Sequence, residues 1–375
     1  MGDNDQQFVP TYKVRFNGTE LNARDDAHLQ EVRVELRRQA PASVSIQFNN
    51  HDGSYDRFRG GSAAQPGNAH MAPGSKVEVS LGYQKQGETK IFEGEVIGTA
   101  VAVTENGPRL FTVRAFDYLH RLTRGRATRT YLDQKFSDIV TAVARERGLT
   151  ADAEDTAFVR EYVIQHNQSD LDFVRGIAGW LDFDLCVRHL EDPKKLRFKA
   201  PDVKASPLLK AVYQNPDLAK KEVFLRRFEG RQSLARVVSD VVVRGWDPQQ
   251  KKEIVGKAPM SQLYDAMGPT AGPDEVKQKW GETERQLVDY KVFSQEEADK
   301  IARTKLNEYA RTFIRADVEV QGDARLHPGA VIEVGAVGDA FDGNYFVESV
   351  THIFGSKVKV SGGYTTRFVA ARCGW

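Results

Sequence analysis

Apolar and polar residues alternate in short runs near both ends of the chain. In the N-terminal part the runs cover residues 12–16, 32–36, 44–48, 76–81, 91–97 and 110–116. In the C-terminal part they cover residues 315–321, 328–334, 343–352, 357–361 and 364–367. A period of two places every second side chain on one face, which predicts strands with one buried face. Short strands separated by turn residues predict a small β-barrel-like region at each end.

The apolar spacing changes between these two regions. From residue 136 onward, apolar residues at i, i+3, i+4 and i+7 predict a helix that ends at Gly148. A second helix is predicted to begin after Ser169, because serine is a favoured N-cap and acidic residues follow it in the first turn. Strands are predicted at residues 183–187 and 195–198. The pattern indicates an α+β insert.

The C-terminal part opens with residues that are harder to assign. β-branched residues at 237–245 predict a strand, whereas residues 250–292 are polar and lack clear periodicity, so we expect an extended excursion there. Ser294 and Glu297 form a capping box that predicts a helix over residues 294–312. The two β regions are similar in size, so descent from one duplicated unit stays open, although the sequence contains no strong internal repeat.

The predicted fold is α+β and mainly β, with two small β-barrel-like domains flanking an α+β insert. We expect a first β-barrel-like domain at residues 1–127, the insert at 128–205 and a second β-barrel-like domain at 206–375. The second domain contains the predicted helix and the excursion.

Composition narrows the possible functions. Lys and Arg number 53 against 52 acidic residues, a net charge of +1, which gives no electrostatic footprint for specific nucleic-acid binding. The two cysteines, Cys186 and Cys373, have no partner at metal-ligand spacing. No apolar run approaches the ~18 residues of a membrane span, so we expect no membrane anchor and synthesis in the bacterial cytoplasm.

Polar clusters in the sequence favour structural roles over catalysis, and we predict no catalytic, cofactor-binding or metal site. Ser169 is explained by helix capping, since a nucleophilic serine would need a base within hydrogen-bond reach. The long loop at residues 51–74 contains His51, Asp52 and His70, but a metal site would need at least three convergent ligands. Paired carboxylates of a glycosidase would need a cleft, so a solvated face is favoured for Glu282, Glu284 and Asp289.

An ordered series of motifs carries a family resemblance. The motifs are FDYL at 116–119, FSDIV at 136–140, GL at 148–149, QSDLDF at 168–173, PGAVIEV at 328–334, FDGNYFV at 341–347 and His352. The series resembles the phage late control D proteins and the N-terminal hub portion of VgrG proteins. These form the baseplate hub of contractile tails and related injection systems. The resemblance covers nearly the whole chain.

The resemblance implies a homotrimer in which two barrel-like domains per subunit alternate around a ring. Such a hub adapts a sixfold tail tube to a threefold spike. The VgrG branch continues into an OB-fold and a spike, whereas this sequence ends at Trp375, so a separate trimeric spike protein is expected. The tail tube or a tube-initiator protein and baseplate wedge components are the other expected partners. The parent particle is left open between a phage virion, a tailocin and a secretion device.

The leading hypothesis is therefore a non-enzymatic structural protein that assembles into a baseplate. Closed rings need heterologous interfaces, which strand edges can provide. We expect the subunit contacts to involve Val237, Val241, Val243, Val331, Val334 and Trp375.

Two alternatives stay open. A tail-associated peptidoglycan hydrolase would clear cell walls in zymography. A carbohydrate-binding module would expose an aromatic platform, whereas Trp180 and Trp246 are predicted to be core residues.

Overall fold

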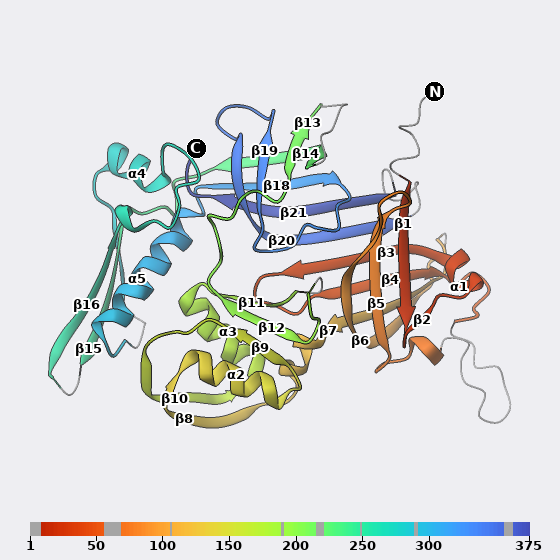
Figure 1. Cartoon of the computed structure of the whole chain (residues 1–375), viewed down its shortest axis with the longest axis horizontal. Helices are drawn as coiled ribbons and strands as arrows, with labels where there is room; N and C mark the ends of the chain where they lie inside the picture. Colours follow the sequence, from red (N-terminus) through yellow and green to blue (C-terminus); the bar gives the residue numbers. More distant parts are fainter. Residues whose placement is uncertain are drawn as a thin grey trace.

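One large sheet runs through both ends of the chain (Figure 1). The computed structural model describes residues 9–55, 69–105, 107–188, 191–214, 221–247, 250–288, 292–355 and 363–375. Within these residues, thirteen strands form the sheet in the order β19-β13-β14-β18-β21-β20-β3-β4-β7-β6-β5-β1-β2. The predicted fold class, mainly β with barrel-like regions, is confirmed.

The N-terminal half of the sheet contains all six strands that alternation predicts. Its elements are β1 (Pro10–Phe16), β2 (Thr19–Glu20), α1 (Ala23–His28), β3 (Leu29–Arg37), β4 (Ser43–Asn49), η1 (Ala69–Met71), β5 (Lys76–Tyr83), β6 (Gly87–Ala102) and β7 (Leu110–Asp117). The six long strands pair in the order β3-β4-β7-β6-β5-β1. In the described residues β1 does not pair with β3, so this barrel-like unit stays open along one side.

The C-terminal half forms a closed barrel of six strands. These are β13 (Lys210–Tyr213), β14 (Glu222–Gln232), β18 (Ile314–Gln321), β19 (Val331–Gly335), β20 (Gly343–Gly355) and β21 (Tyr364–Arg372). The order is β14-β18-β21-β20-β19-β13, and β13 closes the barrel by pairing with β14. Four of the five predicted strands are present. The fifth, at residues 357–361, lies outside the described residues.

The two halves repeat one six-stranded unit. In the two strand orders, β3 corresponds to β14, β4 to β18, β7 to β21, β6 to β20, β5 to β19 and β1 to β13. The matched strands also follow one another in the same order along the sequence. The last pair differs in direction, because β1 is antiparallel to β5 whereas β13 is parallel to β19.

Irregularities in the ladders fall at matching places and fix the register of this repeat. The β3–β4 ladder shifts between Leu29 and Glu31, and the β14–β18 ladder shifts between Leu225 and Arg227. The β6–β7 ladder shifts after Val96, and the β20–β21 ladder shifts after Val347. A β-bulge adds one residue to one strand and bends it, so shared bulges indicate a shared backbone design.

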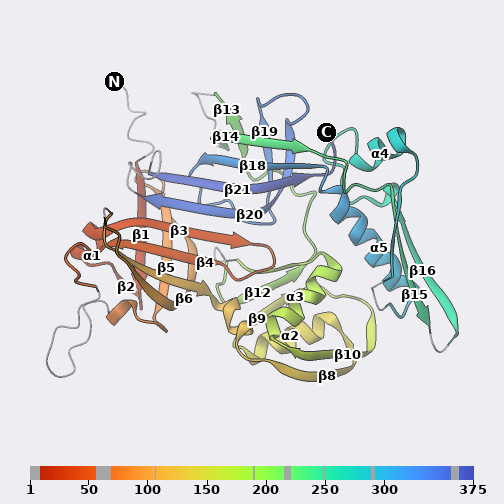
Figure 2. The same ribbon diagram turned by 180° about the vertical axis from the view of Figure 1, so that it is seen from behind.

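A strand pair between β20 and β3 joins the two units within the chain. Residues 349–355 of β20 lie antiparallel to residues 31–37 of β3, and both views show the two strands side by side (Figures 1 and 2). One hydrophobic core continues across this junction, from Val34 and Ile46 to Val350 and Phe368. Because the sheet and core are continuous, the boundaries at 127/128 and 205/206 stay a prediction.

The insert packs below the sheet in the view of Figure 1 and has a core of its own. Its elements are η2 (Tyr118–Thr123), β8 (Ala127–Lys135), α2 (Phe136–Glu146), β9 (Thr150–Ala153), β10 (Val159–Gln168), α3 (Asp170–Leu181), β11 (Asp184–Val187) and β12 (Lys195–Lys199). Both predicted helices and the predicted strand pair are confirmed. Helix α2 is followed by Gly148 at φ +73°, a left-handed conformation that glycine adopts without strain. The β8–β10 ribbon was not predicted.

The segment between β14 and β18 is more ordered than the sequence suggests. It contains β15 (Asp240–Asp247), β16 (Lys252–Pro259), η3 (Met260–Gln262), α4 (Gly272–Trp280), β17 (Glu284–Leu287) and α5 (Gln295–Ala310). The excursion expected at residues 250–292 therefore contains regular elements that its lack of periodicity did not predict. Strand β16 is buried by α5, a helix about 40 residues later in the chain, which packs against its inner face. The helix predicted to begin at the Ser294 capping box is confirmed.

The prediction that Trp246 is a core residue is also wrong, since 58% of its surface is exposed. Val241 and Val243 occupy the face of β15 that packs against α5. Alternation along the strand places Trp246 on the opposite face. Trp180 is partly buried and packs against the insert core.

Candidate functional site

The residues expected at subunit contacts are mostly interior. The five valines, Val237, Val241, Val243, Val331 and Val334, are buried within their own chain. Strand β15 is the middle strand of its sheet, and β19 lies between β13 and β20. Neither strand therefore offers a free edge, and the valine side chains have no exposed area to give to a second chain. Trp375 is 41% exposed and lies at the surface.

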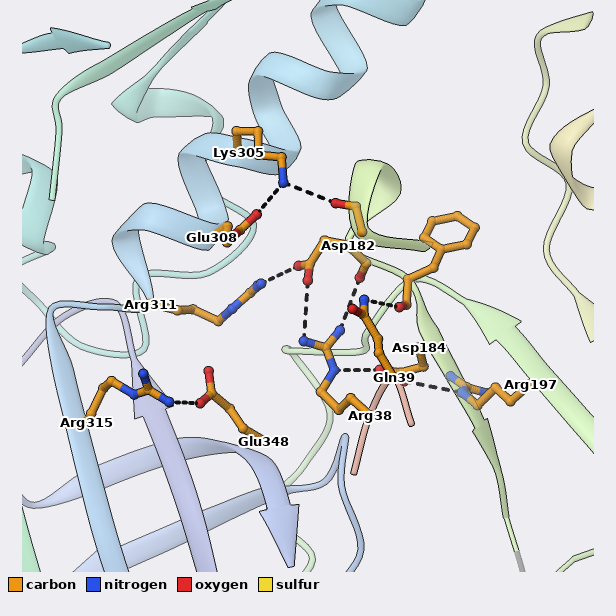
Figure 3. A network of polar contacts seen from close by, with 12 residues as sticks. Arg38, Gln39, Asp182, Asp184, Arg197, Lys305, Glu308, Arg311, Arg315 and Glu348 are labelled. Atoms are coloured by element: carbon orange, nitrogen blue, oxygen red, sulfur yellow. Dashed lines mark hydrogen bonds and ion pairs between the residues drawn. The ribbon is translucent and has the colours of Figure 1, made fainter. Parts of the chain in front are cut away.

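A buried ionic junction gathers three distant segments around Asp182 (Figure 3). Asp182 ends helix α3 in the left-handed conformation, which directs its carboxylate away from the helix. Arg38, in the turn after β3, donates through Nη1 to Oδ1 of Asp182 at 3.3 Å and through Nε to Oδ1 of Asp184 at 2.6 Å. Arg311, just after α5, donates to Oδ2 of Asp182. The first unit, the insert and the α5 segment thus meet at one carboxylate.

Neighbouring contacts hold the β3–β4 turn against the insert. The backbone N–H of Leu185 donates to the carbonyl of Arg38 at 2.8 Å, and the side chain of Gln39 donates to the carbonyl of Phe183 at 2.9 Å. Arg197 on β12 lies 3.4 Å from the second carboxylate oxygen of Asp184. The turn is therefore bound by both backbone and side-chain hydrogen bonds.

Electrostatics keep the junction ionised. Burial by itself would raise the pKa of Asp182, but the guanidinium groups of Arg311 and Arg38 outweigh it and hold that pKa below its usual value. Burial likewise disfavours the charged form of Arg38, yet Asp182 and Asp184 raise its pKa overall. Charges removed from water in this way are tolerated only when paired and hydrogen-bonded.

The two arginines that hold Asp182 come from corresponding connections of the repeated unit. Arg38 lies in the short connection from β3 to β4, at residues 38–42. Arg311 lies near the end of the connection from β14 to β18, at residues 233–313. Since β3 matches β14 and β4 matches β18, each unit contacts Asp182 of the insert through an arginine in the same connection.

A second set of contacts fixes α5 on the insert. Arg160 on β10 and Glu297 at the start of α5 form a buried ion pair, and the Arg160 guanidinium also lies over the ring of Phe293. Lys305 donates to the carbonyl of Gly179 at 3.1 Å. Burial raises the pKa of Glu297 despite the opposing effect of Arg160. The insert and α5 therefore form a continuous packed body.

Sequence reasoning did not identify Arg38, Asp182 or Arg311 as partners. Arg38 looks like an ordinary turn residue, and its partners lie 144 and 146 positions away. The one local signal is an aspartate directly after a helix, where left-handed residues commonly occur.

The polar clusters weighed in the sequence have structural partners. Ser169 caps α3, accepting the N–H of Asp172 at 3.1 Å, as predicted. Glu282 and Glu284 are exposed and lie near Lys277 and Lys257. A hydrogen bond from Lys277 holds the pKa of Glu282 below its usual value, opposite to the shift that a catalytic acid needs. Asp289 lies outside the described residues.

The described ends of the 51–74 loop are held by α1. Asp25 accepts from the hydroxyl of Tyr55 at 2.9 Å and lies 3.0 Å from Nε2 of His70. His51 contacts the ring of His28 edge to face. In the part of the chain that the structure describes, no group of three or more His, Cys, Asp or Glu residues is arranged to hold a metal ion.

Among the helices of the described segments, none has the length and apolar character needed to cross a membrane.

Solved structures share this fold over nearly the whole chain. A 43 kDa tail protein of prophage MuSo2 from Shewanella oneidensis superimposes with a TM-score of 0.66 at 10% identity, covering 97% of this chain and 98% of that one. A tail protein from Neisseria meningitidis gives 0.67 at 13% identity, with 97% of both chains covered. A component of the type VI secretion system from E. coli gives 0.58 at 14% identity, covering 96% and 76%.

These likenesses confirm the predicted resemblance at the level of the fold. No curated protein matches the sequence significantly. A family model does match, and it extends over residues 6–355, which include both six-stranded units up to the end of β20 and the insert between them. The chain belongs to the family described as the Alg8 N-terminal domain.

Proposed function

We propose that the protein is a structural baseplate hub of a contractile tail or injection system. The observation that carries this proposal is the repeated six-stranded unit, joined within the chain through β3 and β20. Three copies bring together six similar units. A ring of this kind presents near-sixfold symmetry to a tail tube and threefold symmetry to a spike. The fold shared with phage tail proteins and a type VI secretion component supports the proposal.

Parts that occur once per chain supply the threefold features of such a ring. In the described residues the insert has no counterpart in the second unit, and the 233–313 connection corresponds to only five residues, 38–42, in the first unit. We propose that they contact the partners that follow threefold symmetry, a separate trimeric spike protein and baseplate wedge components. The tail tube, or a tube-initiator protein, would then bind the surface made by the repeated units.

The proposed role is non-enzymatic. Glu282 and Glu284 lie on an exposed surface beside lysines, and the hydrogen bond from Lys277 lowers the pKa of Glu282, opposite to the shift that a catalytic acid needs. Zymography on cell walls tests this point directly. The purified protein is expected to leave no clearing, and a cleared zone would support the peptidoglycan hydrolase instead.

Mass measurement tests the ring. Light scattering of the purified protein, alone and mixed with the spike protein of the same particle, is expected to give assemblies that contain three chains of 42.0 kDa each. Electron micrographs of the same sample are expected to show rings with a central channel. A protein that stays monomeric even with the spike present contradicts the hub.

A further inference from the structure

Two strand edges are left unpaired, one in each unit, and their counterparts in the other unit are the two edges that pair at the junction inside the chain. Strand β6 pairs with β5 only up to Glu95, so residues 98–102 pair on one side alone, with β7. Strand β14 pairs with β13 only up to Leu225, so residues 227–232 pair on one side alone, with β18. Within the described part of the chain, no other strand covers either edge.

The junction inside the chain shows what such edges bind. Strand β20 is the counterpart of β6, and β3 is the counterpart of β14. The corresponding half of β20, residues 349–355, pairs with β3 at residues 31–37. The chain therefore already contains one copy of the contact that the free halves of β6 and β14 lack.

We propose that residues 98–103, at the end of β6, in one copy of the chain pair, antiparallel, with residues 228–233, at the end of β14, in the next copy. This inference rests on the proposed ring and adds its interface. The contact is heterologous, because each copy contributes a different edge on each side. Repetition of one heterologous contact closes into a ring when its rotation returns to the start.

The shared bulges give the register of this pairing. Thr351 lies opposite Glu35 in the internal junction, and their counterparts are Ala100 and Arg231. The pair Phe354 and Val32 corresponds in the same way to Val103 and Phe228. In this register the small residues Gly98, Ala100 and Ala102 lie opposite Ser233, Arg231 and Glu229. No two like charges face each other, and like charges directly opposite would destabilise the pair.

Exposed apolar side chains mark the same edge of β6. Val101 and Val103 are 42% and 67% exposed, whereas of their counterparts in the internal junction His352 is buried and Phe354 is partly buried against the core. Val101 in β6 and Val103 directly after it lie in register with the inward face, and no strand of the described residues lies beside them. A second copy docked through β14 would bring Phe228 against Val103. Exposed apolar residues along an unpaired edge are a known template for pairing with another chain.

Disulfide cross-linking tests the register. Ala100→Cys combined with Arg231→Cys places two thiols opposite each other across the proposed contact, within the ~4.4–6.8 Å Cα separation that a disulfide needs. Within one chain the two positions lie on strands seven places apart in the sheet and do not pair with each other, so the bond is expected only between copies. Oxidation is expected to give two-chain and three-chain species on non-reducing gels.

Three matched variants make the result specific. Thr351→Cys with Glu35→Cys reproduces the pair inside one chain, and oxidation is expected to consume both thiols without changing the gel mass. Each single cysteine variant is expected to stay as one chain. Ala100→Cys with Gln232→Cys shifts the pair by one residue, which turns one thiol to the other face. Equal cross-linking of the shifted pair would overturn the register.

A charge at the edge gives a second readout that needs no disulfide. Val103→Asp is expected to reduce the light-scattering mass from three chains to one at equal protein concentration. Leu132→Asp is the control, because Leu132 is 60% exposed but lies on β8 of the insert, in a separate two-stranded sheet that contains neither edge. It is expected to leave the mass unchanged. A trimer that neither cross-links at Ala100 and Arg231 nor responds to Val103→Asp overturns the strand pairing while leaving the hub intact. A monomer in every sample contradicts the hub itself.

Discussion

The Nε atom of Arg38 lies 2.6 Å from Oδ1 of Asp184, although 146 positions separate the two residues in the chain. The contact links the turn after β3 to the start of β11, and Asp182 extends it to Arg311 beyond α5. The buried ionic junction therefore holds the insert against the turn after β3 and the end of α5. Paired buried charges depend strongly on each partner, because a charge left alone in the interior is costly.

Removal of the central carboxylate is expected to destabilise the protein strongly. Asp182→Ala leaves the guanidinium of Arg311 without this acceptor and deprives Arg38 of one of its two carboxylates, so we expect a loss of about 3–5 kcal/mol in the free energy of unfolding. Urea denaturation followed by tryptophan fluorescence measures it. Glu282→Gln, which removes the partner of exposed Lys277, is the control and is expected to leave the free energy of unfolding nearly unchanged. Equal small effects of both variants would show that the ionic junction contributes little to the free energy of unfolding.

The buried His352 is expected to make the protein sensitive to acid. Its Nε2–H donates to the carbonyl of Leu326, the hydroxyl of Tyr364 donates to Nδ1, and burial lowers its pKa from 6.5 to about 4. The folded state therefore favours the neutral ring. The associated stability is fully present above pH 6.5 and is lost as the pH falls toward 4, by about 3 kcal/mol in total.

His352→Gln tests this titration. Comparison of unfolding free energies at pH 7 and pH 4.5 is expected to show a steeper loss for the natural protein than for the variant. His166→Gln alters an exposed ring and is expected to keep the natural pH dependence. The same pH dependence in the natural protein and in His352→Gln would rule out His352 as the titrating group.

Close packing of α5 on β16 is expected to tolerate no side chain at Gly256. A Cβ atom there would lie 2.2 Å from the backbone carbon of Ala298, so Gly256→Ala must displace the helix. We expect a loss of about 1–3 kcal/mol. Gly176→Ala within α3 meets nothing within 4 Å and is expected to stabilise the protein by up to about 1 kcal/mol. Thermal melting of both variants should give shifts of opposite sign, and a neutral Gly256→Ala would contradict the tight contact.

The N-cap of α3 is expected to contribute measurably to the insert. Ser169→Ala removes the acceptor for the N–H of Asp172 and should cost about 1 kcal/mol. Ser169→Asn retains a capping oxygen and should recover most of that loss. Chemical denaturation distinguishes the two, and equal losses would mean that the hydroxyl acts through its donation to the Asp172 carboxylate instead.

Strands were predictable where alternation and burial agree. In β4 the buried residues Val44, Ile46 and Phe48 alternate with polar ones, and the strand lies where the pattern places it. Strand β8 escaped prediction because Thr128, Thr130 and other polar residues occupy one face while the other is only partly buried. Strand β16 escaped because α5, distant in sequence, provides its burial.

The repeat was invisible in the sequence for a related reason. Val34 in β3 corresponds to Gly230 in β14, and Val44 in β4 corresponds to Ala316 in β18. The backbone register and the bulges are shared, but each core is filled by different side chains. Packing of cores accepts many combinations of apolar residues as long as the total volume is kept. The ionic junction could not be predicted either, because hydrogen bonds between distant segments produce no periodic pattern in the sequence.

The repeated fold does not constrain the length of the connection between β14 and β18. Five residues, 38–42, make the corresponding connection in the first unit, which shows that the repeated fold does not need the longer one. Loops at such positions accept insertions at small entropic cost. A lineage could therefore replace residues 233–313 to suit a new companion protein while the strands that build the repeated units stay the same.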